Sequence, residues 1–290
     1  MIIDDLYLAL PGNMPVSLIA GMFGLLFGSF LNVVIYRIPK MMQRDFDNYV
    51  AEQSGNELTH KDVFNLMVPR SACPHCGHQI TAIENIPVFS YVALLRGRCS
   101  ECKAPISIRY PVVELLTALI TFGLIWHFGT GAAGLASVVF AYFLIALALI
   151  DFDTQLLPDD LTLPLLWCGL IVNTQGIFCS LTSAVAGAVI GYLTLWLVYW
   201  VFKLLTGKEG MGYGDFKLLA ALGAWCGWTV LPALIFFSSL AGAVIGISVI
   251  VITKRERHVP MPFGPYLAVA GLFMLPYGQL ITHKYLGIML

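Results

Sequence analysis

Residues 194–219 read TLWLVYWVFKLLTGKEGMGYGDFKLL: an apolar run, a glycine-rich hinge and a second apolar run. Apolar stretches of this kind are typical of helices that cross a membrane. The hinge ends in Asp215, and a charged side chain at the mouth of such a stretch is costly and usually functional. The stretch therefore predicts a membrane-embedded helical fold and a candidate site at Asp215.

The composition of the whole chain supports a membrane protein. Hydrophobic residues make up 58% of the 290 residues and charged residues 11%, which excludes an ordinary water-soluble domain. A spanning helix needs ~20 mostly apolar residues. We therefore expect an all-α polytopic membrane protein with about eight transmembrane helices, or seven if the short sixth run joins the seventh across Gly227 and Trp228. The eight apolar runs lie near 15–36, 111–128, 132–150, 161–177, 182–204, 216–227, 229–253 and 263–281.

The positions of Lys and Arg predict the orientation, because basic loops remain cytoplasmic. With eight spans, 15 of the 16 basic residues fall on one side, and only Lys284 lies outside. Both termini are then expected to be periplasmic, with the first span a retained anchor. The predicted cytoplasmic stretches are 37–110, 151–160, 203–217 and 254–262.

The only long polar stretch divides the chain into three parts. We expect an N-terminal transmembrane helix over 1–37, a cytoplasmic insert over 38–110 and a transmembrane bundle over 111–290. Near the start of the insert, apolar residues recur on one helical face over 42–50, which predicts a helix lying on the membrane surface.

The insert contains two CxxC pairs separated by 22 residues. Two thiolate knuckles at this spacing can close a tetrahedral site, and cytoplasmic placement argues against disulfides. We predict a structural zinc ion, because four sulfur ligands leave no position for a substrate. His75 and His78 are read as solvent-facing rather than as ligands. The predicted metal ligands are Cys73, Cys76, Cys99 and Cys102.

Five aspartates lie at the predicted cytoplasmic boundary. Asp159 and Asp160 precede a span, and one of them is as readily a helix cap as a functional group. Asp153 is read as a solvated charge. Asp151 ends a long apolar helix, so its side chain is expected to point between helices. A helix cap at Asp215 would not need the two glycines that precede it, so Asp215 has no simple structural explanation.

Two aspartates that meet from different helices share a proton, so that one acts as a base and the other as an acid. Such a pair activates water against a peptide bond without a metal or a covalent nucleophile. The chain has no GxSxG or HExxH motif that offers another route to hydrolysis. The alternative is a proton-coupled membrane transporter with a structural zinc domain, although the internal repeats common in transporters are not found.

Several long motifs in order resemble the bacterial type IV prepilin peptidases, a branch of the GxGD intramembrane aspartyl proteases (peptidase family A24). The match runs nearly end to end. It rests on GSFLNVVIYRIP (28–39), CPHCGHQI (73–80), ENIPVFSY (84–91), RGRCSEC (96–102), RYPVVE (109–114), IDFDTQLLPD (150–159), GYGDFK (212–217) and PFGPYLA (262–268). The PFGP segment opens the last span, where it either lines a cleft or forms a membrane-entry turn.

The resemblance implies a multifunctional enzyme of the bacterial inner membrane. Asp151 and Asp215 would be the catalytic pair that cuts the leader of type IV prepilins and of type II secretion pseudopilins on the cytoplasmic side. The enzyme would then methylate the new N-terminal residue with S-adenosylmethionine. Gly97 and Arg98, where the family often has Gly-Lys, would belong to the methyl-transfer site. The lipid bilayer is the other partner, and no nucleic-acid partner is expected.

Overall fold

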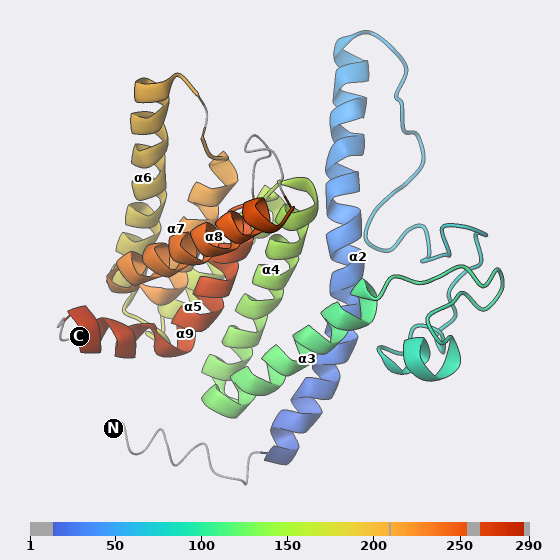
Figure 1. Cartoon of the computed structure of the whole chain (residues 1–290), viewed down its shortest axis with the longest axis horizontal. Helices are drawn as coiled ribbons and strands as arrows, with labels where there is room; N and C mark the ends of the chain where they lie inside the picture. The colour runs from blue at the N-terminus through green and yellow to red at the C-terminus, as the bar shows by residue number, and fades with distance from the viewer. Residues whose placement is uncertain (1–13, 209, 254–261, 287–290) are drawn as a thin grey trace. The chain divides into compact units, whose positions relative to one another are not determined.

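The computed structural model describes residues 14–208, 210–253 and 262–286 (Figure 1). The two termini and the basic cluster at 254–257, which contributed to the predicted orientation, lie outside the described residues. The chain forms two compact units, Met1–Gly129 and Thr130–Leu290, and each is described by itself.

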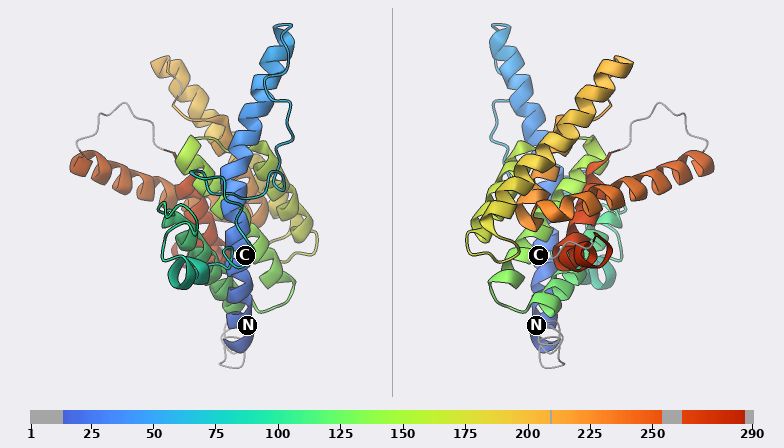
Figure 2. Two further views of the ribbon diagram at one scale, coloured as in Figure 1. Left: turned by 90° about the vertical axis from the view of Figure 1, so that its right-hand side faces the viewer. Right: turned by 90° about the vertical axis from the view of Figure 1, so that its left-hand side faces the viewer.

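The first unit begins with one unusually long helix. Helix α2 (Met14–Gln53) has 40 residues and is a single uninterrupted rod in Figures 1 and 2. The predicted helix at 42–50 is confirmed, but this segment is the C-terminal part of α2 and not an element of its own; its place on the membrane surface stays a prediction. The loop that follows α2 folds back and supports this C-terminal part: Asn48 exchanges two hydrogen bonds with the backbone of His60, at 3.0 and 2.9 Å.

Helix α3 (Arg109–Phe128) packs against α2 at a glycine-lined crossing. A Cβ added to Gly24 would lie 2.8 Å from the Cα atom of Ala118, and one added to Gly28 would lie 2.6 Å from that of Glu114. Small residues at these positions let two membrane helices approach closely. Along the chain, the cysteine loops and the short π-helix η2 (Ser90–Leu94) connect α2 to α3.

The second unit is a helical bundle. In the described residues, six helices of the chain are long and apolar enough to cross a membrane, and the chain is a multi-pass membrane protein. Each of the eight predicted apolar runs overlaps a helix, although the run at 161–177 extends past the end of α5 at Asn173. The elements of the second unit are α4 (Ala132–Thr154), α5 (Asp159–Asn173), α6 (Leu181–Thr206), α7 (Tyr213–Cys226), η3 (Trp228–Val230), α8 (Leu231–Thr253) and α9 (Gly264–Leu286).

Two of the predicted spans are short. Helices α5 and α7 have 15 and 14 residues, and a helix of that length reaches only about 22 Å at ~1.5 Å per residue. The hydrocarbon core is ~30 Å thick, so the count of eight full crossings stays a prediction. The separation of the sixth run from the seventh is confirmed: α7 ends at Cys226, and Gly227 turns the chain with a φ of 83°.

Helix α7 packs against α5, α6 and α9, and glycines bring its backbone against that of α6. A Cβ on Gly187 would lie 2.3 Å from the Gly223 carbonyl oxygen, and one on Gly191 would lie 2.8 Å from that of Leu219. Because side chains are absent at these points, the inner half of α7 is fixed by direct backbone contact.

Candidate active site

Asp151 occupies the last turn of α4, as the sequence predicted, and points into the bundle. The helix continues to Thr154. Its C-cap residue, Gln155, has a left-handed backbone conformation and donates its N–H to the Asp151 carbonyl oxygen at 2.8 Å. The side chain of Asp151 is only 5% exposed. Its Oδ2 atom accepts the backbone N–H of Gly264 at 2.8 Å, so the carboxyl group is oriented by the first residue of α9.

Asp215 lies in the first turn of α7, which begins after the N-cap residue Gly212. Asp215 is 8% exposed, and it lies close enough to Asp151 for the two carboxyl groups to interact. The glycine before it is required by space, because a Cβ on Gly214 would lie 2.7 Å from the Cβ of Leu157. The GxGD pattern therefore lets the loop after α4 pack directly on the helix that carries the second carboxyl group.

Leu157 lies between Gly214, the residue before Asp215, and Gly264, whose N–H binds Asp151. It touches Gly214 on one side, and its Cδ2 atom would lie 3.2 Å from a Cβ on Gly264 on the other. The PFGP segment thus lies beside Asp151, and of its two sequence-based interpretations the structure favours the one in which it lines the site. Leu157 and the bond from Gly264 were missed by sequence reasoning, because an apolar residue and a glycine N–H carry no signal of their partners.

We expect Gly264→Ala to impair this arrangement. The added Cβ would lie 2.6 Å from Asp151 Oδ2, so the carboxyl group or the start of α9 has to shift. A misplacement of ~1 Å can cost about a hundredfold in rate, and we expect leader cleavage to fall by roughly tenfold to a hundredfold. Gly123→Ala is the matched control, because a Cβ there meets nothing within 4 Å. Equal cleavage by the two variants would contradict the role given to Gly264.

The other boundary aspartates are not part of this pair. Asp153 is exposed in the last turn of α4. Pro158, rather than an aspartate, is the N-cap of α5, so the capping interpretation is wrong, and Asp159 and Asp160 lie in the first helical turn. The Lys217 ammonium contacts both carboxylate oxygens of Asp159 at 2.7 Å and ties the start of α7 to α5.

The four cysteines of the insert converge as predicted. Their sulfur atoms all lie within 4.8 Å of one another. Cys73 Sγ is 3.8 Å from Cys102 Sγ, and Cys76 Sγ is 3.9 Å from Cys99 Sγ. A tetrahedral site with metal–sulfur bonds of about 2.3 Å has sulfur atoms about 3.8 Å apart. The cluster therefore fits a four-coordinate metal and can hold one.

Backbone N–H groups favour the thiolate form of the first cysteine in each knuckle, whereas burial and the neighbouring thiols raise the pKa of Cys76 to about 11. N–H groups of His75 and Cys76 lower the pKa of Cys73 to about 7, and N–H groups in the second knuckle lower the pKa of Cys99. The histidines do not join the cluster: the ring of His78 lies 3.2 Å from the Glu84 carboxylate instead. The donor set is thus four sulfurs, as the sequence predicted.

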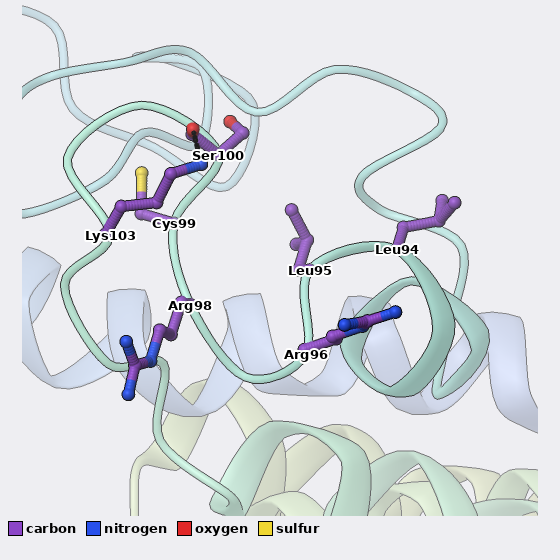
Figure 3. A pocket seen from close by; sticks show the side chains of 7 residues that line it. All are labelled: Leu94, Leu95, Arg96, Arg98, Cys99, Ser100 and Lys103. Carbon is purple, nitrogen blue, oxygen red and sulfur yellow. Dashed lines mark hydrogen bonds between the residues drawn. The ribbon is translucent and has the colours of Figure 1, made fainter.

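A cavity of about 660 Å³ lies beside the second knuckle (Figure 3). Figure 3 shows Lys103 reaching back to the Ser100 carbonyl oxygen, to which it donates a hydrogen bond of 2.6 Å. Gly97 has a φ of 73°, and a Cβ there would press on the Tyr91 hydroxyl at 3.2 Å, so a glycine is needed to shape this loop. The lining residues are Leu94, Leu95, Arg96, Arg98, Cys99, Ser100 and Lys103.

Comparisons with known proteins identify the family. Residues 22–128 match the bacterial peptidase A24 N-terminal domain, and residues 138–247 match the type IV leader peptidase family. The chain is 56% identical to a prepilin leader peptidase/N-methyltransferase of Stutzerimonas stutzeri over 93% of both chains. It is also 56% identical to the Pseudomonas aeruginosa protein of that name over 91% of both chains.

The protein of that name from Aeromonas hydrophila is 54% identical over 91% of this chain and 92% of its own. No solved structure matches the chain. The family predicted from the motifs is confirmed, and the chain belongs to the type IV leader peptidase family.

Proposed function

We propose that this protein removes the leader peptide of type IV prepilins and of type II secretion pseudopilins, and then methylates the new N-terminus. The observation that carries the proposal is the pairing of Asp151 and Asp215, which two different helices bring together inside the bundle. The names of the relatives support both activities, and they do not favour a proton-coupled transporter.

The aspartate pair supports hydrolysis by activated water. The two carboxyl groups share one proton, because two buried like charges are costly at short range. The ionised member takes a proton from water as the water oxygen attacks the peptide carbonyl carbon. The protonated member donates its proton to the amide nitrogen as the C–N bond breaks. The Gly264 N–H occupies one oxygen of Asp151 and fixes the direction in which that carboxyl group acts.

The reaction is placed on the cytoplasmic side of the bacterial inner membrane, with both termini in the periplasm. The support is the distribution of basic residues, since Lys and Arg in short loops mark the cytoplasmic side. Asp151 lies at the end of α4, and Asp215 lies at the start of α7, which borders the basic stretch 203–217. A prepilin, which has a basic leader and an apolar helix, would then present its cleavage site at the membrane boundary.

We assign the metal to zinc, held by the four cysteines, with a structural role. Four thiolates complete a tetrahedral zinc site and leave no open position for water. Zinc supplies folding energy to small loops of this kind when it is bound. By activity, the chain is divided into the anchor at 1–37, the insert at 38–110 and the peptidase bundle at 111–290.

The methyl donor, S-adenosylmethionine, is assigned to the insert at Gly97 and Arg98. Arg98 lines the cationic cavity, and a guanidinium suits the carboxylate of the methyl donor. When bound there, S-adenosylmethionine would supply a methyl group from its sulfonium sulfur to the neutral α-amine of the cleaved pilin, which would lose one proton to water. Methylation therefore follows cleavage, because the amine is free only after the leader has been removed.

The test is the mass of the product from purified protein, a prepilin and S-adenosylmethionine. We expect loss of the leader and gain of one methyl group, and loss of the leader alone when the methyl donor is omitted. In the same assay, Arg98→Gln should give cleaved pilin with little methylation. An uncut prepilin would overturn the proposed function, and fully methylated product from Arg98→Gln would overturn the assigned donor site.

A further inference from the structure

An aromatic cluster joins α6 to the first turn of α7, with Tyr199 and Phe216 buried and Tyr213 half exposed. Tyr199 of α6 is only 2% exposed. Its ring centroid lies 5.2 Å from that of Tyr213 and 5.7 Å from that of Phe216, and the latter two rings are 5.4 Å apart. Aromatic pairs at these separations contribute beyond the area that they bury. The three rings therefore pack together, and two of them, Tyr213 and Phe216, flank Asp215 in the sequence.

The hydroxyl group of Tyr199 is held in place from two directions. The Lys203 ammonium, one turn later on α6, donates a hydrogen bond to it at 3.1 Å. The Tyr213 hydroxyl lies 3.5 Å from the same oxygen. A phenol oxygen both accepts and donates hydrogen bonds, so one buried hydroxyl links a charged group of α6 to the first residue of α7.

This cluster fixes the direction of Asp215. Successive residues of an α-helix are rotated by about 100°, so Asp215 lies about 200° from Tyr213 and about 100° from Phe216 around α7. The two aromatic side chains contact Tyr199 of α6, and Asp215 is thereby directed toward the interior, where it is buried within interaction distance of Asp151. Rotation of the first turn would move the carboxyl group out of its place beside Asp151.

The first turn depends on side chains more than the rest of α7 does. At its inner half, α7 is fixed to α6 by backbone contacts at Gly187 and Gly191. At its start, α7 follows a glycine-rich loop that offers few conformational restraints. The first turn also packs on Leu157 at Gly214 and is joined to α5 by the bond between Lys217 and Asp159. The side chains of that ion pair are partly exposed, and exposed ion pairs contribute little.

We propose that Tyr199, held by Lys203, is a positioning residue of the peptidase site that sets the rotation of the first turn of α7 and so the direction of Asp215. This inference rests on the proposed peptidase function. It concerns residues that touch neither the reacting atoms nor the metal, and it predicts an effect on catalysis without an effect on substrate binding.

The experiment measures kcat and KM for leader cleavage by full-length Tyr199→Phe, Lys203→Met and the double variant. Loss of one hydrogen bond that orients the catalytic group should lower kcat by about fivefold to tenfold, with KM unchanged within about twofold. Because both substitutions break the same bond, the double variant should be no slower than the slower single variant. Lys203→Arg, which keeps a charged donor, should recover part of the rate.

Tyr192→Phe is the matched control. Its ring also contacts Phe216, at 5.9 Å, and in the described part of the chain its hydroxyl has no hydrogen-bond partner. We expect kcat for this variant to equal that of the wild type. Methylation of a pre-cleaved pilin, which does not use the aspartates, serves as the measure of folding in every variant.

Three results would overturn the positioning role while leaving the peptidase function intact. They are equal kcat for Tyr199→Phe and Tyr192→Phe, a multiplicative loss in the double variant, and a parallel loss of pilin methylation, which would indicate general misfolding. A wild-type protein that leaves prepilin uncut would instead overturn the proposed function itself.

Discussion

Asp151→Asn and Asp215→Asn are each expected to stop leader cleavage, lowering kcat by about a thousandfold or more. An amide can neither take a proton from water nor share one with its partner, so the remaining carboxyl group cannot complete the pair. Asparagine has nearly the same volume as aspartate and can still accept the Gly264 N–H, so the fold should persist. The measurement is the rate of leader release from a purified prepilin.

Asp153→Asn is the matched control for this experiment, because it is an exposed carboxylate on the same helix. It should cut at nearly the wild-type rate. Both dyad variants should still methylate a pre-cleaved pilin but should make no methylated product from intact prepilin. If Asp153→Asn were inactive and Asp151→Asn active, the catalytic assignment would belong two residues later.

Replacing Cys99 and Cys102 together by serine is expected to remove the metal and abolish methylation. Structural zinc sites supply about 10–16 kcal/mol of binding free energy to small zinc-dependent folds, so the loops around residues 70–105 should become sensitive to proteolysis. Elemental analysis should find about one zinc per wild-type chain, as one tetrahedral four-thiolate site requires, and none in the variant. Product mass should show cleaved, unmethylated pilin.

Cleavage should persist at least in part in this variant, because Asp151 and Asp215 lie in the other compact unit, which has its own core. Cys168→Ser is the control, since this cysteine of α5 is outside the cluster, and it should keep both the metal and methylation. Fully methylated pilin from the double cysteine variant would show that the insert is not the methylating element. A metal-free preparation with unchanged protease resistance would contradict the structural role of the metal.

The sequence alone determined the features that depend on local pattern. Apolar runs predicted the helices, because each run satisfies its own backbone hydrogen bonds within the membrane. The paired CxxC spacing predicted the four-sulfur cluster, because each knuckle forms within a few residues. Asp151 and Asp215 were singled out because a carboxyl group beside an apolar run is unusual.

Only the tertiary structure decided how these parts meet. The apolar pattern predicted a helix at 42–50 but did not indicate that it continues the first span through Pro39, since the supporting bonds come from a loop that returns later. The same holds for the bond from Gly264 to Asp151, the packing of Leu157 between two glycines, and the link from Tyr199 to Tyr213. Each joins residues on different elements, and their side chains or N–H groups look ordinary in isolation. Local pattern fixes which segments form helices, whereas the contacts that orient a catalytic carboxyl group exist only after those helices have packed.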